Sequence, residues 1–166
     1  PVVGSLEKIM NGPASGFDGF KGSSSKVLMY FGWGDALVAP QSGIDYYQKI
    51  ESNLGDKAAD KFRLFMAPGM AHCYSGPGPN SFGQYSLSPA LKNDPQHNIH
   101  RAIEYWVEQG VAPETIIATK YSDDKPEQGA LITRPLCPFP QLAVYNGKGS
   151  VNRHENFTCQ QGAQVP

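Results

Sequence analysis

Two continuous apolar runs mark the first half of the chain. KVLMYFGW covers residues 26–33, and KFRLFMAPG covers residues 61–69, where Pro68 and Gly69 interrupt the run. An uninterrupted apolar run of this length is typical of a strand that is buried on both faces, as in a parallel sheet. We therefore predict two buried strands at these positions.

Between the two runs, apolar residues recur at helical spacing and predict a helix over residues 40–55. Ser42 is the predicted N-cap, and Gly55 is the predicted end, because these residue types favour the two ends of a helix. The apolar positions of this predicted helix are Ile44, Tyr47 and Ile50.

Residues 94–110 carry the strongest helical pattern in the chain. Asp94 is the predicted cap, Pro95 suits the first turn, and Gly110 is the predicted end. The residues of its apolar stripe are Ile99, Ala102, Ile103, Trp106 and Val107.

The remaining segments are richer in turn-forming residues. Residues 1–25 are turn-rich, and residues 74–94 hold Gly, Pro, Ser and Asn without a clear period, which predicts a long loop. A further strand is expected from about Thr115, followed by an extended piece and a strand or arm over residues 130–147. The order strand, helix, strand, helix predicts an α/β fold with a parallel sheet flanked by helices and joined by right-handed crossovers.

Composition and charge narrow the classes of partner. The 166 residues amount to one domain or part of a larger one, with 40% hydrophobic and 17% charged residues. The formal net charge is -1 and no dense basic run is present, which argues against nucleic acid and against an anionic membrane as partners. No apolar stretch approaches the roughly 20 residues that span a bilayer. The first residues lack the pattern of a signal peptide, which leaves open one that is removed or that lies upstream.

The three cysteines, Cys73, Cys137 and Cys159, fit no zinc-binding spacing. If Cys137 and Cys159 pair, they close a loop of about 22 residues, worth roughly 3 kcal/mol in the chain-entropy model, and tie down a tail with little regular structure. Cys73 is then left either as a buried free thiol or with a partner outside this chain. Asn156 begins an N-glycosylation sequon beside Cys159, and together these features favour a secreted protein.

An aspartate and a histidine each follow one of the predicted buried strands. Asp35 comes after the first strand and His72 comes after the second. In open α/β sheets the functional groups lie just past the carboxyl ends of the strands, so both side chains are expected on the same rim. A carboxylate beside a histidine fixes the tautomer of the ring and prepares it as a general base.

The nucleophile that such a pair serves is missing from this chain. In α/β-hydrolases the chain order is nucleophile, acid, histidine, and the nucleophile lies on a G-x-S-x-G turn after a strand. No such turn occurs here: GSSS at residues 22–25 precedes a strand, and YSGPG follows His72 too closely. We therefore expect the serine to lie upstream and the chain to be the C-terminal part of a larger hydrolase.

Four segments of the chain resemble the tannase and feruloyl esterase family, secreted fungal and bacterial carboxylesterases with an α/β-hydrolase fold. The GW-x-D and GM-x-HC pieces are characteristic in combination, and the match covers most of the chain from residue 26 onward. The matching segments are KVLMYFGWGDALVAP, FRLFMAPGMAHC, NIHRAIEYWVEQGVAPETIIATKY and TRPLCPFPQLAVYNGKGSVNRHENFTC.

The resemblance implies a role for three residues. Asp35 corresponds to the acid of the catalytic triad and His72 to its base. Cys73 corresponds to one half of a disulfide whose other cysteine precedes the catalytic serine, so that partner and the serine both lie upstream. By this resemblance residues 1–166 are the C-terminal part of one α/β-hydrolase domain.

The resemblance also implies a disulfide between Cys137 and Cys159. The family has a lid domain with a bound calcium, inserted between the serine and the acid, which places the lid before residue 1. No calcium ligand, and no other metal ligand or cofactor, is therefore expected in this chain. His97 and His100 stand three residues apart, but no carboxylate completes a metalloprotease pattern, so a solvated or capping role is expected.

Two classes of function remain open on the sequence. The first is an esterase component that acts on phenolic esters such as gallates, ferulates or simpler aryl esters. The second is a secreted α/β fragment used for binding or stability, in which Asp35 and His72 are structural residues. A nucleophile turn immediately upstream would decide for the esterase.

Overall fold

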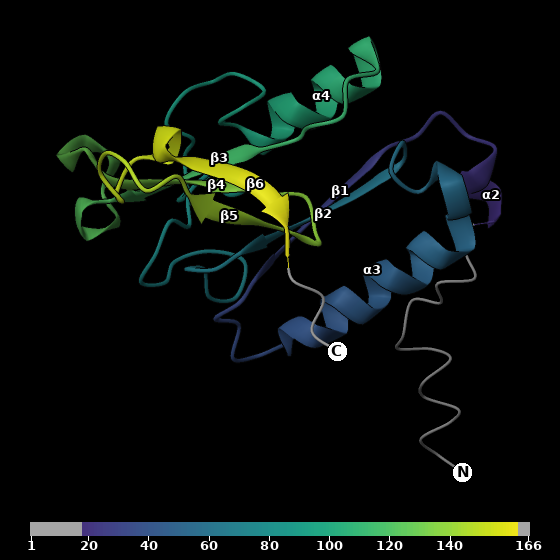
Figure 1. The fold of residues 1–166 in the computed structure, drawn as a ribbon, viewed down its shortest axis with the longest axis horizontal. Coiled ribbons are helices and arrows are strands. Elements are labelled where there is room, and N and C mark those ends of the chain that lie inside the picture. The colour runs from purple at the N-terminus through teal and green to yellow at the C-terminus, as the bar shows by residue number, and fades with distance from the viewer. Residues whose placement is uncertain (1–17, 163–166) are drawn as a thin grey trace.

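The computed structural model describes residues 18–162 of the protein (Figure 1). In chain order its helices and strands are α2 (Asp18–Lys21), β1 (Val27–Gly32), α3 (Pro40–Leu54), β2 (Phe62–Ala67), α4 (Ile99–Gln109), β3 (Ile116–Tyr121), β4 (Ala130–Leu136), β5 (Gln141–Tyr145) and β6 (Phe157–Gln161). Four short 3-10 helices lie between them: η2 (Gly55–Lys57), η3 (Ser122–Asp124), η4 (Pro126–Gln128) and η5 (His154–Asn156).

The two apolar runs form β1 and β2, which pair in parallel in the register Val27↔Phe62 to Gly32↔Ala67. The helix α3 connects them, as a crossover between parallel strands requires. Alternate residues of these strands pack on opposite faces of the pair, so both faces need apolar side chains. This explains why the runs are continuous rather than alternating.

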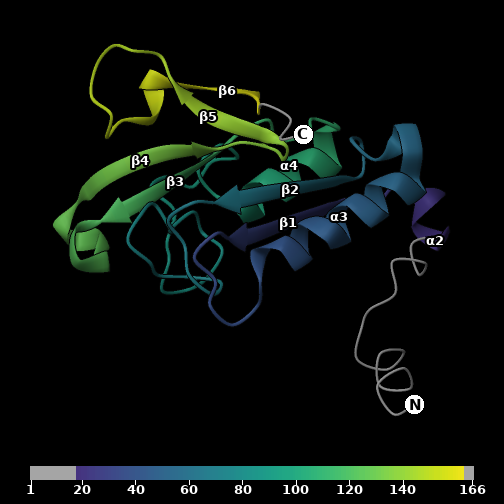
Figure 2. The same cartoon turned by 60° about the horizontal axis from the view of Figure 1, so that its bottom comes forward.

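Helices α3 and α4 lie on opposite sides of the β1–β2 pair (Figure 2). The core on the α3 side is formed by Ile44, Tyr47, Ile50, Leu54, Phe62, Leu64 and Met66, with Val27, Met29 and Phe31 packed against it. The core on the α4 side includes Ile99, Ala102, Phe65, Ala67, Met70 and Phe82, with Leu28 and Tyr30 packed against it. The strand pair is thus a layer between two helices.

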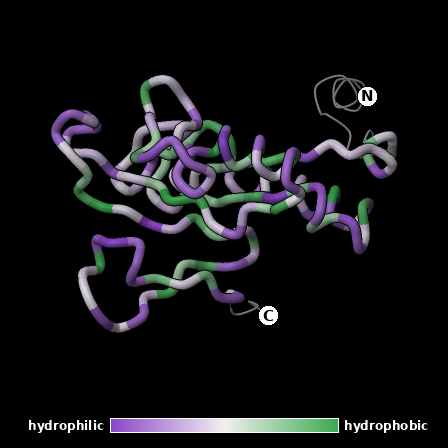
Figure 3. Tube along the Cα trace, turned by 90° about the horizontal axis from the view of Figure 1, so that it is seen from above, coloured by the Kyte–Doolittle hydropathy of each residue, from purple (hydrophilic) through white to green (hydrophobic). Residues whose placement is uncertain are grey.

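Parallel pairing is limited to β1 and β2 among the described residues, so the expected parallel sheet is only partly present. Strands β3 and β4 pair antiparallel, and β5 and β6 form a second antiparallel pair. The connection from β3 to β4 holds only η3 and η4, too short for a crossover helix, and this forces an antiparallel return. This connection is mostly hydrophilic and forms the left-hand tip of the tube in Figure 3.

The predicted first helix is present, but it begins earlier than its predicted cap. Ala39 occupies the N-cap position and Pro40 the first turn of α3, so the prediction of Ser42 as N-cap is wrong. The hydroxyl of Ser42 instead donates to Ala39 O at 2.6 Å within the first turn. Gly55 ends the helix at φ 59 as expected, and its N–H donates to Glu51 O.

The second predicted helix begins later than Asp94. Asn98 is the N-cap of α4, and its side chain accepts from His100 N at 3.0 Å. Asp94 caps a separate turn through Gln96 N and His97 N. A tertiary hydrogen bond from the first helical residue to Phe82 O, at 2.9 Å, fixes the start of α4 at Ile99. The short helix α2 also departs from the turns expected over residues 1–25, of which residues 1–17 lie outside the described part.

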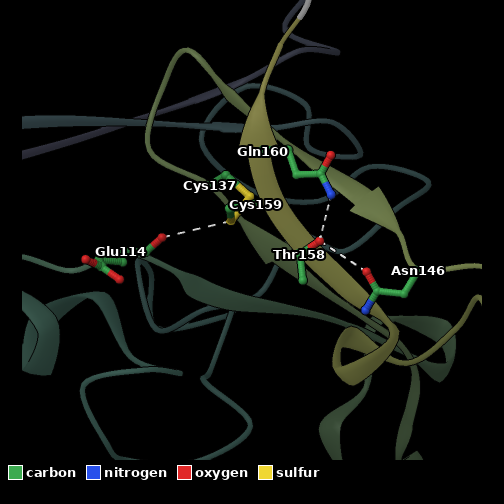
Figure 4. The surroundings of a disulfide bond; sticks show 6 residues. All are labelled: Glu114, Cys137, Asn146, Thr158, Cys159 and Gln160. Atoms are coloured by element: carbon green, nitrogen blue, oxygen red, sulfur yellow. Dashed lines mark hydrogen bonds between the residues drawn. A yellow bond between two sulfur atoms is a disulfide. The ribbon is translucent and has the colours of Figure 1, made fainter.

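The tail of the chain is more regular than expected, because β5 and β6 form a hairpin. Cys137 and Cys159 form a disulfide bond between the end of β4 and the middle of β6 (Figure 4). Just after Cys137 the chain crosses the outer edge of β2: Phe139 N donates to Leu64 O at 2.8 Å, and Pro138 forms a bridge with Phe65. The hairpin is therefore attached to β2 as well as to the disulfide.

Among residues 18–162, the helices are all too short or too polar to cross a bilayer.

Replacing both Cys137 and Cys159 with alanine removes the covalent closure across their 22-residue separation. We expect the free energy of unfolding to fall by roughly 3 kcal/mol, because the unfolded chain regains loop entropy. Urea unfolding of the complete protein measures the change. The control is Gln160→Ala, which alters an exposed residue of the same strand and leaves the disulfide in place. An unchanged unfolding midpoint in the double variant would contradict the expectation.

Candidate active site

The end of β1 is held against the loop that follows β2. Trp33 N donates to Ala67 O at 3.0 Å, and Gly34 N donates to Met70 O at 2.9 Å. These hydrogen bonds continue the contact of the two strands past their last paired residues. As a result, the residue after Gly34, which is Asp35, lies beside the loop that carries the histidine.

A glycine is required where the two segments meet. A Cβ atom on Gly32 would lie 2.3 Å from Ala71 O and 2.4 Å from Met70 O, both backbone atoms. No real side chain fits at these distances, so the close approach of the two backbones depends on the missing side chain of Gly32. The glycine between two aromatic residues of the first apolar run thus serves the site rather than the strand.

Asp35 uses both carboxylate oxygens. Oδ1 accepts from Leu37 N at 2.8 Å and from Val38 N at 2.9 Å, while Oδ2 contacts His72 Nδ1 at 2.7 Å. Burial of the side chain raises the pKa of Asp35, but the hydrogen bonds from Val38, His72 and Leu37 outweigh it and lower the pKa below the usual value. The carboxyl group therefore stays ionised at neutral and mildly acidic pH.

His72 lies in a tight turn between Gly69 and Gly78. Ala71 N donates to Ser75 O at 3.0 Å and closes the turn, and Gly78 N donates to Gly69 O at 3.1 Å. The backbones of these two glycines are in direct contact. A Cβ atom on Gly69 would lie 2.2 Å from Gly78 Cα, so no side chain fits at position 69. The turn is therefore closed at its base and presents His72 at its tip.

The Asp35–His72 pair combines a buried acid with an accessible base. The side chain of Asp35 is 3% exposed, whereas that of His72 is 44% exposed. An ionised carboxylate can only accept, so Nδ1 of His72 carries the hydrogen and Nε2 of the neutral ring is an acceptor. Nε2 makes no hydrogen bond to another described residue. The ring can therefore take a proton from a group that approaches from outside.

A pocket of about 290 Å³ opens at this pair. It is lined by Tyr30, Phe31, Gly32, Asp35, Val38, Met70, His72 and Cys73. Apolar side chains form much of the wall, and the acid and base contribute its ionisable groups. A pocket with apolar walls and few polar groups is typical of a small-molecule or catalytic site.

Cys73 is exposed and is a free thiol among the described residues, so the expectation of a buried free thiol is wrong. Its backbone has φ 65, a conformation that residues other than glycine rarely adopt. Burial, and to a lesser degree the neighbouring Cys73, raise the pKa of Tyr30. Cys73 lines the same pocket as His72.

The other sequence-predicted sites lie on the C-terminal hairpin or on the loop before α4. Asn156 is half-buried, and its Nδ2 donates to Ser150 O at 2.8 Å. Of the two roles expected for His97, solvated or capping, the solvated one is wrong, because the side chain is buried; its Nδ1 contacts Asp94 Oδ1 at 2.7 Å. His100 is exposed on α4. The described residues contain no group of three or more His, Cys, Asp or Glu that could hold a metal ion.

Sequence reasoning missed five residues of the pocket wall: Tyr30, Phe31, Gly32, Val38 and Met70. Tyr30 and Met70 read as ordinary core residues in apolar runs. Their position within a few residues of Gly32 and His72 is the signal that could have marked them. Val38 follows Asp35 by three positions, and its backbone N–H also binds the carboxylate.

The chain is similar to known esterases. The family model described as "Tannase and feruloyl esterase" matches residues 3–160. An uncharacterized esterase of Xanthomonas campestris pv. campestris is 41% identical over 96% of this chain and 30% of the relative. A probable feruloyl esterase B-1 of Aspergillus terreus is 35% identical over 84% of this chain and 26% of the relative. The chain thus spans less than a third of the length of these curated relatives.

A solved structure shows the same fold. The crystal structure of feruloyl esterase B from Aspergillus oryzae matches with a TM-score of 0.75 and 33% identity, over 90% of this chain and 29% of that one. The family match covers most of the chain and includes the segments that carry Asp35 and His72. On this evidence the chain belongs to the tannase and feruloyl esterase family.

Proposed function

We propose that this chain supplies the acid and the base of a secreted serine carboxylesterase that hydrolyses phenolic esters of the gallate or ferulate type. Asp35 and His72 are the two members of the Ser-Asp-His triad that lie in this chain, and the serine lies in an upstream segment. The observation that carries the proposal is the 2.7 Å contact between Asp35 Oδ2 and His72 Nδ1 at the ends of two neighbouring parallel strands.

The geometry supports a general-base role for His72. Asp35 accepts from Nδ1–H and leaves Nε2 free to accept a proton from the serine hydroxyl as it attacks the ester carbonyl. The imidazolium that forms is stabilised by the Asp35 carboxylate. His72 then donates the proton to the leaving alcohol, and a water molecule repeats the sequence to release the acid. The alternative of a purely structural pair does not explain why the histidine is exposed over a pocket.

The pocket beside His72 supports an upstream nucleophile. The free face of His72 and the exposed thiol of Cys73 both border the same pocket. A cysteine next to the serine would bond Cys73 and hold the serine turn against the base. In this proposal the disulfide couples the two parts of the triad, while the lid domain and its calcium also belong to the upstream segment.

The names of the relatives support the substrate class, and the cysteines and the sequon support the secretory route. The relatives' names include feruloyl esterase and esterase, which favours an aromatic acid ester as the substrate. The disulfide between Cys137 and Cys159 and the sequon at Asn156 favour a secreted protein, because disulfides persist in oxidising compartments.

Asp35→Asn in the complete enzyme should lower kcat by roughly 10⁴-fold, the effect of this change in serine proteases. An asparagine can still accept from Leu37 N and Val38 N, but its NH₂ group donates to Nδ1 and leaves the hydrogen on Nε2, which is the wrong tautomer. His72→Ala should cost several orders of magnitude. Hydrolysis of methyl ferulate and methyl gallate measures kcat and KM.

Asp45→Asn is the matched control for this pair of variants. Asp45 is an exposed acid on α3 that accepts from Gln41, away from the pocket wall. We expect its kcat to stay at the wild-type value. A folded Asp35→Asn enzyme whose kcat stayed within a few-fold of wild type would mean that another acid serves His72.

Cys73→Ala should act differently from the triad variants. Loss of the proposed disulfide loosens the serine against the base, so both kcat and the melting temperature should fall, while the pH dependence keeps its shape. Peptide mapping of the unreduced wild-type protein should recover Cys73 joined to an upstream cysteine. Recovery of Cys73 as a free thiol would overturn the assignment.

Asn156 should carry a glycan when the protein passes through a eukaryotic secretory route. The remaining hydrogen on a glycosylated Nδ2 can keep the contact with Ser150 O. Mass spectrometry of the C-terminal peptide before and after glycosidase treatment tests this, with Thr158→Ala as the variant that destroys the sequon. An unchanged peptide mass in the secreted wild type would contradict it.

A further inference from the structure

The histidine turn is held from its outer side by a second set of polar contacts. Gly76 O lies one residue after the Ser75 carbonyl that closes the turn, and it accepts two hydrogen bonds. Lys120 Nζ donates to it at 2.7 Å, and Asn80 Nδ2 donates to it at 3.1 Å. Neither donor takes part in the Asp35–His72 contact on the inner side of the turn.

Lys120 is placed for this contact. It lies near the end of β3, where the register with β4 shifts between Lys120 and Tyr121. Such an irregularity re-aims a side chain and is common beside active sites. The side chain of Lys120 is only 15% exposed, and its charge is paired with Asp124 Oδ1 at 2.5 Å. Because this largely buried ammonium group donates a hydrogen bond to Gly76 O, it anchors the turn that carries His72.

Asn80 and Asp124 complete the set. Asn80 is buried, and its Nδ2 also donates to Asp124 Oδ1 at 3.3 Å, so Lys120 and Asn80 both donate to the same two oxygens, Gly76 O and Asp124 Oδ1. Asp124 has φ 55, a left-handed conformation that aspartate tolerates better than most residues. The backbone of Asn80 is in turn fixed to β3, since its N–H donates to Thr119 O at 3.2 Å. The anchor is thus rigid on the sheet side.

A displacement of Gly76 would also displace the imidazole of His72, because both residues belong to the same closed turn. The turn from Gly69 to Gly78 is closed by backbone hydrogen bonds and by the glycine contact, so its two ends cannot move separately. Asp35 fixes only one atom of the His72 ring and leaves the ring 44% exposed. The orientation of the ring therefore depends on where the turn sits as well as on the carboxylate.

We propose that Lys120, together with Asn80 and Asp124, is a positioning group for His72: it fixes the Gly76 carbonyl and thereby holds the imidazole in line with Asp35 and the nucleophile. This inference rests on the proposed role of His72 as general base. Lys120 does not contact the reacting atoms; it acts through the turn. Its loss should lower turnover more than substrate binding.

The test compares Lys120→Met with wild type in the complete enzyme, with methyl ferulate as substrate. Methionine keeps the apolar stem and removes the donors. We expect kcat to fall roughly 10- to 100-fold, since small misplacements of a catalytic group have effects of this size, while KM changes less than twofold. The acidic limb of the kcat/KM profile should move to lower pH, because a displaced ring is stabilised less by Asp35 when protonated.

Three further variants make the result specific. Lys125→Met removes an exposed lysine of the same connection and should leave kcat and the pH profile unchanged. Lys120→Arg keeps a donor for Gly76 O and should recover most of the lost turnover. Asp124→Asn keeps the Lys120 donor but removes its counter-charge, so kcat should fall by a smaller factor than in Lys120→Met. This variant tests the same inference if Lys120→Met does not fold.

The outcomes separate this inference from the proposed function. If His72→Ala abolishes turnover and Lys120→Met or Asp124→Asn shifts the acidic limb as stated, the positioning role is supported. If those variants lower only the melting temperature, with kcat and the pH profile as in wild type, Lys120 is merely structural and the inference is wrong. If His72→Ala keeps full turnover, the proposed function itself fails.

Discussion

The closeness of two backbones at Gly32 is the constraint on which the site depends. The Met70 and Ala71 carbonyls occupy the space that a side chain at this position would fill. Because β1 and β2 are paired in parallel up to Gly32 and Ala67, the two chains leave the sheet side by side and in the same direction. Asp35 and His72 then meet a few residues beyond the last paired positions of the two strands.

This arrangement explains how the described residues hold the proposed acid and base in register. A cluster of buried apolar residues lies on each side of the β1–β2 pair, with α3 covering one face and α4 the other. Hydrogen bonds from the backbone after Asp35 and from the ring of His72 keep the carboxyl ionised despite its burial. Fixed donors around a buried charge cost no reorganisation when the neighbouring ring becomes charged.

The sequence predicts the parts of the molecule whose signals are local. The strands β1 and β2, the helices and the positions of Asp35 and His72 follow from apolar periodicity and from what comes after each strand. Strand β2 is buried as predicted, whereas the prediction of a fully buried β1 is wrong, because Val27–Phe31 are only half-buried. The start of α4 was placed too early because Asp94 and Asn98 are both good cap residues; Asp94 caps a separate turn, while the Asn98 cap and a tertiary hydrogen bond from Ile99 N to Phe82 O fix the helix start. The antiparallel pairs were missed for a similar reason: periodicity does not show that β3 and β4 turn back on each other.

The site was predicted less completely than the fold. An acid and a histidine after buried strands are visible in the sequence, but Lys120 reads as an ordinary charged residue near the end of a strand. Its proposed role depends on Gly76, which is 44 residues away in the sequence, and on Asp124, four residues later beyond the end of β3. It also depends on a register shift between β3 and β4 that has no sequence signature. Contacts of this kind become visible only in three dimensions.

The segment Pro138–Pro140 has a consequence for how the protein avoids self-association. It lies along the outer edge of β2, where Phe139 N donates to Leu64 O. An uncovered strand edge is a template for strands of other molecules, and proteins protect such edges with loops and prolines. Pro138 and Pro140 lack an N–H group, so this covering segment offers few donors to a further strand. The disulfide at Cys137 ties this covering segment to β6, so the edge of β2 stays covered.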